Sequence, residues 1–186
     1  MSSRWIHQND GAAYLKGWAC RQWHCPNIEA MSTNASVVVT PRGTRGQRMP
    51  RLPGPLTRSF TEVMYRIFRK RPFMGMSILR VTTVGARSGQ QRHTVLSYFP
   101  DGNDAWLIVG SAGGAITHPA WYFNMARHPD QVWIEFGSRK LKVRPQTLQG
   151  EARARAWKRI VDDAPQYAGY LAKTDREIPV IRLSAA

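Results

Sequence analysis

The sequence predicts a mainly β protein in which about six antiparallel strands form a small closed or half-closed barrel with helices packed around it. Two observations favour this class. Strand signals outnumber helical ones between Ile78 and Leu183, and the strand-like runs are short, rich in β-branched and aromatic residues, and bounded by turn signals. Several short strands accompanied by few helices indicate a barrel.

Six runs carry the strand signal, and two of them flank a hairpin turn. The runs are Ile78–Val84, Thr94–Phe99, Ala105–Val109, Val132–Phe136, Lys140–Val143 and Ile178–Leu183. The hairpin turns at Gly137–Ser138. Alternation alone leaves open whether Val132, Ile134 and Phe136 face inward or outward.

Three segments have helical character. They are Pro55–Lys70, Pro119–Arg127 and Glu151–Asp163, followed by a short helix or turn that carries Tyr167 and Tyr170. The first predicts a basic amphipathic helix, because Phe60, Val63 and Ile67 recur at helical spacing and arginines lie elsewhere on its surface. Such a helix either docks on the barrel, the commoner outcome, or lies on an anionic membrane surface.

Residues 1–50 read differently from the remainder. They show no sustained helical or strand period, so we expect them to be poorly ordered or loosely helical. Met31 and Met49 are both available starts, and one explanation is that translation begins downstream of residue 1. The expected organisation is an N-terminal extension, 1–50, followed by the barrel domain, 51–186.

The amino-acid composition and net charge limit the kinds of molecule that the protein could bind. The 186 residues are 42% hydrophobic, enough for a core, and carry a formal net charge of +15. An anionic partner is therefore available in principle: nucleic acid, anionic lipid or a polyanionic cofactor. Cys20 and Cys25 lack a second ligand pair, so we expect no metal site and a cytoplasmic protein with free thiols. No apolar run approaches the length of a membrane span.

Two glycine-bearing turns follow strand-like runs in the centre of the chain. In the first, Gly85–Arg92, we expect Gly85 and Gly89 to permit positive φ and expose amides, while arginines and Ser88 add donors. That combination is typical of a phosphate cradle. The second turn, Ser111–Gly114, offers a hydroxyl beside open backbone, so the two turns could flank one ligand.

Several familiar chemistries find no support in the sequence. The first turn lacks the Gly-Lys-Ser/Thr of a Walker loop and the Gly-x-Gly-x-x-Gly of a dinucleotide site, which disfavours ATP and NAD. No Ser/His/Asp triad, paired carboxylates or metal cluster is evident. Hydride chemistry fits this absence, because a cofactor then carries the reaction and the protein supplies binding and orientation.

An ordered set of motifs resembles the deazaflavin (coenzyme F420)-dependent nitroreductase family. The motifs are Thr-x-Gly-x-x-Ser-Gly-x-x-Arg at 83–92, Ser-x-Gly-Gly at 111–114, Pro-x-Trp-Tyr-x-Asn at 119–124, Pro-x-Tyr-x-x-Tyr at 165–170 and Thr-x-Arg-x-Ile-Pro-Val at 174–180. The resemblance covers about Phe73 to Leu183. It implies a split β-barrel of the flavin-reductase/pyridoxamine-oxidase-like kind. Ala112 stands where family members often have lysine.

The resemblance also implies a function and a site. The expected reaction moves a hydride from reduced coenzyme F420 to an electrophilic organic acceptor, namely a quinone, an enone or a nitro-aromatic. Expected cofactor-binding residues are Gly85, Arg87, Ser88, Gly89, Arg92, Thr94, Ser111, Ala112, Gly113, Gly114, Pro119, Trp121 and Tyr122. Tyr167 and Ser111 are the expected catalytic residues, and Tyr167 and Tyr170 face the substrate.

Two alternatives remain open at this point. A flavin mononucleotide (FMN) reductase of the same fold would use similar turns with a different cofactor tail. A basic nucleic-acid-binding protein would exploit the net charge and interleaved aromatics, although no recognised motif supports it. For the enzyme we expect an apolar acceptor and, through residues 55–70, contact with the inner face of the cell membrane.

Overall fold

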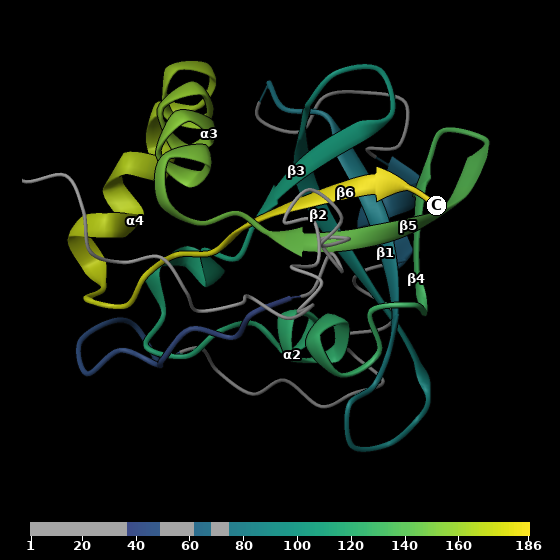
Figure 1. The fold of residues 1–186 in the computed structure, drawn as a ribbon, viewed down its shortest axis with the longest axis horizontal. Coiled ribbons are helices and arrows are strands. Elements are labelled where there is room, and N and C mark those ends of the chain that lie inside the picture. Colours follow the sequence, from purple (N-terminus) through teal and green to yellow (C-terminus); the bar gives the residue numbers. More distant parts are fainter. Residues whose placement is uncertain (1–36, 49–61, 68–74) are drawn as a thin grey trace, which may run out of the picture. The chain divides into compact units, whose positions relative to one another are not determined.

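The computed structural model describes residues 37–48, 62–67 and 75–186, which belong to one compact unit, 34–186. Its centre is a closed barrel with the strand order β1-β2-β3-β6-β5-β4 (Figure 1). The strands are β1 Ile78–Val84, β2 Gln91–Pro100, β3 Ala105–Val109, β4 Val132–Phe136, β5 Arg139–Thr147 and β6 Val180–Ala185. Every neighbouring pair is antiparallel, which confirms the predicted class.

The barrel interior is filled by alternate residues of the strands. In β4, Val132 and Ile134 are fully buried whereas Trp133 between them is not, so alternation places the first two inside. Their interior neighbours include Leu79, Val81, Ile108, Ile181 and Leu183. This settles the facing that the sequence left open.

Helices cover the barrel from different sides. Helix α3, Gly150–Asp163, and helix α4, Ala168–Lys173, lie together beside it, and helix α2, Ala120–Arg127, packs against β1 (Figure 1). A second apolar cluster forms where α3 and the 3-10 turn η3, Pro165–Tyr167, meet the strands. Ile160 and Leu107 are completely buried in this cluster.

Three strands differ from their predicted bounds. β2 begins at Gln91, because Gln91 and Arg92 pair with β1 instead of standing at the tip of the turn. β5 extends to Thr147 through Pro145. The proline is tolerated because β4 pairs with β5 only as far as Lys142, so one side of β5 has no strand neighbour beyond that point. β6 is shifted two residues toward the C-terminus.

The N-terminal segment 37–48, here called the strap, lies beside the second turn. A parallel bridge joins Gln47 to Ala115, and the Gly43 amide donates to the Ile116 carbonyl at 3.0 Å. Gly114 adopts a φ of +83°, and a Cβ there would come within 2.7 Å of the Lys173 side chain. Only glycine fits that position without strain. Part of the predicted N-terminal extension therefore packs on the barrel domain.

Of the predicted helix Pro55–Lys70, the described part is helical over 62–67. Tyr65 is buried, with the Arg80 guanidinium 4.9 Å from its ring centroid. Val63 and Ile67 are 54% and 57% exposed. Helix 62–67 therefore packs on the barrel through Tyr65, and the part of the expected apolar stripe formed by Val63 and Ile67 is open to solvent. Among the described residues no helix is long and apolar enough to cross a membrane.

Candidate active site

A pocket of about 1220 Å³ opens between the first turn, α2 and the strap. It is lined by Val39, Arg42, Glu62, Gly85, Ala86, Arg87, Ser88, Arg92, His93, Thr94, Thr117, His118, Ala120, Trp121, Phe123, Asn124, Ala126 and Arg127. Small-molecule sites usually measure about 300–1,000 Å³, so this cavity has room for a large ligand. Six residues of the expected cofactor site are among its walls: Gly85, Arg87, Ser88, Arg92, Thr94 and Trp121.

The pocket is strongly cationic. Four arginines line it, Arg42, Arg87, Arg92 and Arg127, and its one carboxylate is Glu62. Arg80 donates to both oxygens of that carboxylate, at 2.9 and 3.0 Å. Glu62 is therefore ion-paired, through an arginine that it shares with Glu135. Guanidinium groups are planar, permanently charged donors suited to phosphate and carboxylate, so these walls fit a polyanionic ligand.

Backbone hydrogen bonds shape the first turn from inside. The Gly85 amide donates to the Gln90 carbonyl at 2.8 Å, and the Gly89 amide donates to the Gly85 carbonyl at 2.9 Å. The sequence predicted that these amides would be exposed to an anion. The structure shows that both are already used in hydrogen bonds within the turn. The charged donors left for a ligand are side chains, above all those of Arg87 and Arg92.

The two glycines of this turn serve different purposes. Gly89 has a φ of +64°, in the region that favours glycine, as predicted. The expectation of positive φ at Gly85 is wrong, since Gly85 is absent from the positive-φ glycines. Gly85 instead provides space, because a Cβ there would lie 2.6 Å from the Ser88 hydroxyl oxygen.

Asn124 of α2 holds the first turn in place. Its Oδ1 accepts from the Ala86 amide at 2.9 Å, and its Nδ2 donates to the Thr83 hydroxyl at 3.0 Å. The side chain is buried, and its bond to Thr83 is protected from water, whereas the bond to Ala86 is half-buried. The last residue of the Pro-x-Trp-Tyr-x-Asn motif thus connects the helix to the turn, while Trp121 of the same helix lines the pocket.

The second turn is held by a buried arginine. Arg176, only 4% exposed, donates through Nε to the Ala115 carbonyl at 2.7 Å and through one terminal nitrogen to Gly110 and Ser111 carbonyls at 2.9 and 2.6 Å. Ala112 has a φ of +46°. Ser111 to Gly114, Pro119 and Tyr122 are not among the lining residues, and their expected contact with a cofactor stays a prediction.

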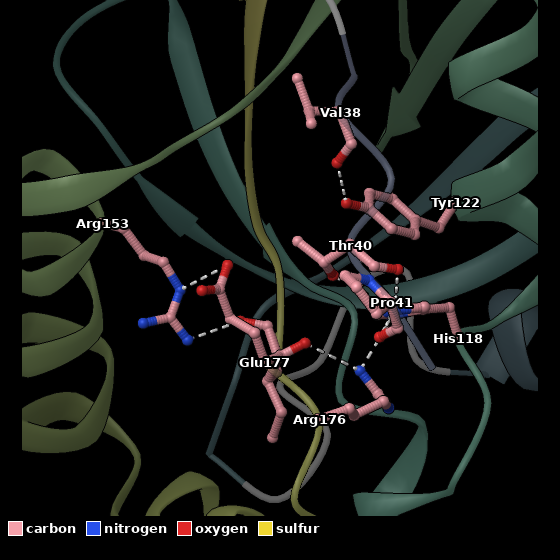
Figure 2. A network of polar contacts seen from close by, with 9 residues as sticks. Val38, Thr40, Pro41, His118, Tyr122, Arg153, Arg176 and Glu177 are labelled. Atoms are coloured by element: carbon pink, nitrogen blue, oxygen red, sulfur yellow. Dashed lines mark hydrogen bonds and ion pairs between the residues drawn. The ribbon is translucent and has the colours of Figure 1, made fainter. Parts of the chain in front are cut away.

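His118 connects Arg176 to the strap (Figure 2). Arg176 donates to its Nδ1 at 3.1 Å, and because arginine can only donate, the ring proton must lie on Nε2. Nε2 then donates to the Thr40 carbonyl at 2.9 Å and the Pro41 carbonyl at 3.2 Å. Burial, with the positive charge of Arg176 as the second cause, lowers the pKa of His118 below its usual range.

The two C-terminal tyrosines lie in the second apolar cluster. The Tyr167 ring packs edge-on against Phe99 and Tyr170, with centroids 5.7 and 5.4 Å apart. Burial raises the pKa of Tyr167, so its phenol is neutral and keeps its proton. Neither tyrosine is among the residues that line the pocket, and their expected catalytic and substrate-binding roles stay predictions.

Several lining residues were not expected from the sequence. Arg42 and Val39 come from a segment without periodicity, which gave no signal of structure. Phe123 and Arg127 lie on α2 within or just after a recognised motif. Helical spacing would have found Arg127, which lies three residues after Asn124 and four after Phe123, but it gives no link between Phe123 and Trp121. His93 carried no motif of its own. It lies in β2 with its Nδ1 2.9 Å from the Thr82 hydroxyl.

The barrel and its arginine-lined cavity define a small-molecule-binding protein suited to a polyanionic ligand. Comparison with known proteins narrows this class. The family described as F420H(2)-dependent quinone reductase matches residues 57–184. The chain belongs to this family. Membership confirms the predicted family likeness and, with it, the class of oxidoreductase that uses reduced coenzyme F420.

Individual relatives agree with the family match. The chain is 38% identical over 122 residues to an F420H(2)-dependent quinone reductase of Mycobacterium tuberculosis strain H37Rv, covering 64% of this chain and 80% of the relative. A solved F420-H2 dependent reductase is 38% identical with a TM-score of 0.52, covering 57% and 93%. A structure described as a domain-swapped dimer is 34% identical with a TM-score of 0.53, covering 69% and 99%.

The lowered pKa of His118 makes stability depend on pH. Unfolded histidine has a pKa near 6.5, so the unfolded chain takes up a proton first as pH falls below about 6.5. The free energy of unfolding should then decrease between pH 7 and 5, because a protonated Nδ1 cannot accept the hydrogen bond from Arg176. The negative charge of Glu177 favours protonated His118 in the folded protein, but it is the smallest of the causes.

Denaturant unfolding of the wild type and His118→Gln at both pH values checks this dependence. The variant, whose amide does not titrate, should lose less stability over the same interval. Parallel losses in the two proteins would show that His118 is not the titrating group.

Proposed function

We propose that this protein transfers a hydride from reduced coenzyme F420 to a quinone, with enones and nitro-aromatics as further acceptors. The observation that carries the proposal is the pocket with four arginines, three of which lie within the residues that the family match includes. The relatives named above support the coenzyme and the acceptor class.

The side chains of the pocket suit the anionic parts of such a coenzyme. Arg87 and Arg92 would hold its phosphate and acidic tail, and the Ser88 hydroxyl, 3.4 Å from an Arg92 terminal nitrogen, adds a donor between them. Gly85, Gly89 and Thr94 shape this end. When bound, the reduced coenzyme supplies the hydride.

The α2 end of the pocket suits a flat ring. Trp121 is 5% exposed and lines the cavity, so it offers a rigid apolar surface. Pro119 and Tyr122 fix the start of α2, and Ser111 to Gly114 would approach the ring from the second turn. Tyr167 and Ser111 are the proposed proton donors to the reduced acceptor, and Tyr170 would contact it.

We further propose that the protein is cytoplasmic and that the pocket mouth faces the anionic inner surface of the cell membrane. An apolar quinone would be dissolved in that membrane. Val63 and Ile67 are exposed on one side of helix 62–67, which also supplies Glu62 to the pocket. Phe123 and Val39, both 41% exposed, line the cavity as well. Apolar side chains beside a cationic cavity would gain from lipid burial and from attraction to anionic headgroups.

The proposed activity predicts selective binding of the deazaflavin. Titration of the full chain with F420 and with FMN, followed by fluorescence, should give tighter binding of F420, because its longer anionic tail reaches more of the arginines. Reduced F420 should then be oxidised on addition of a soluble quinone. Tighter binding of FMN would make this protein a flavin enzyme of the same fold.

Arg92→Ala should weaken F420 binding by about 1.5–3 kcal/mol, the usual contribution of a hydrogen bond to a charged group. Arg155→Ala is a matched control, since Arg155 lies on the solvent side of α3 and pairs only with Glu151 among the described residues. Equal affinities for the two variants, measured by the same titration, would make the first turn structural.

Val63→Asp and Ile67→Asp should each weaken partitioning to anionic vesicles, measured by cosedimentation, by about tenfold or more, because burying such a side chain in lipid contributes about 1.5–3 kcal/mol. Leu171→Asp is the matched control: Leu171 is 40% exposed on α4 and does not line the pocket. If all three variants bind vesicles alike, the stripe at Val63 and Ile67 has no part in membrane contact.

A further inference from the structure

The strap is fixed to the barrel domain along its length. The Tyr122 hydroxyl donates to the Val38 carbonyl, and His118 binds the Thr40 and Pro41 carbonyls (Figure 2). Farther along, the Thr44 and Arg45 amides donate to the Asp175 carboxylate at 2.9 and 3.0 Å. The Thr44 hydroxyl donates to the same carboxylate, and this bond first, with those from the backbone amides, holds the pKa of Asp175 at about 2, so the carboxylate is charged at any physiological pH.

The anchors on either side of Arg42 present its side chain to the pocket. His118 holds residues 40 and 41, and the Gly43 amide is bound to Ile116, so the backbone at residue 42 is constrained from both directions. Arg42 lines the same cavity as the arginines of the first turn. It forms no ion pair with another described residue.

The family match does not include this segment. It begins at residue 57, whereas the strap ends at residue 48. Arg42 and Val39 are therefore contributions of this chain that membership of the family does not assign. A fourth guanidinium in the same cavity adds like-charge repulsion, which an anionic ligand would relieve.

We propose that Arg42 is an additional binding residue for the anionic portion of the coenzyme, and that His118, held by Arg176, is the positioning residue that directs it there. This inference rests on the proposed function. The arrangement makes the strap a wall of the coenzyme site. Arg45, three residues farther along, presents only its backbone to Asp175 and Thr174 and does not line the pocket.

Binding titrations of F420 with full-length variants test the ligand contact. Arg42→Ala should raise the dissociation constant about tenfold or more, as loss of one charge-assisted hydrogen bond does, and Arg42→Lys should recover part of the affinity. Arg45→Ala removes the same charge from the same segment and should change affinity less than about twofold, since an exposed charge outside the site acts only weakly.

The outcomes separate this inference from the proposed function. If the wild type binds F420 and Arg42→Ala matches Arg45→Ala, the inference fails while the proposed function stands. If the wild type does not bind F420, both fail. Because Arg42 and Arg45 are exposed, neither substitution removes a buried contact on which folding depends.

A double-mutant cycle tests the positioning role of His118. In a His118→Phe background, Arg42→Ala should cost less than about threefold, because the strap no longer holds residue 42 in place; in His118→Gln, which keeps a donor, the full loss should return. Hydrogen exchange at the Gly43 amide should speed up in His118→Phe alone. An undiminished Arg42→Ala effect in His118→Phe would overturn the positioning role.

Discussion

The arrangement of the pocket depends on one buried arginine. Arg176 has no ion-pair partner among the described carboxylates, and its donors instead go to four backbone carbonyls, including that of Glu177, and a neutral imidazole. A charge removed from water is costly unless its donors are satisfied, so the carbonyls of Gly110, Ser111 and Ala115 must stay close to the positions seen here. The same contacts fix His118, and through it the strap. One side chain thereby orders the second turn and one wall of the cavity.

The barrel was predictable because its strands depend on local pattern. β1, β3 and β4 have the bounds that β-branched and apolar runs indicated. The ends of the strands were less predictable, since they depend on where the neighbouring strands in the barrel begin and end. β2 reaches back to Gln91 because β1 is long enough to pair with it, and Pro145 fits within β5 only where β4 has already ended. Neither fact can be read from one segment alone.

The site was predictable where a motif keeps its residues together along the chain. Arg87, Ser88 and Arg92 lie on one turn, and Trp121 follows a proline at a helix start, so motif spacing was enough to predict them as site residues. Arg42 could not be found in this way. It reaches the pocket through bonds to residues far along the chain, within a segment whose composition indicated no structure. Tyr167 was noticed through its motif position, which did not indicate that its ring packs against Phe99.

The strap has a consequence for the order in which the molecule is built. Its bonds join residues that are 131 positions apart, Thr44 and Asp175, whereas three of the six strand pairs of the barrel join strands that follow one another along the chain. Closing a long loop costs more chain entropy than forming a hairpin, so the strap should attach after the barrel has closed. Asp175 lies just before β6, the strand that closes the barrel between β3 and β5, so residues 175–185 both complete the barrel and anchor the strap. The wall that carries Arg42, and with it the competence to bind a polyanion, would therefore arise only after these residues have folded.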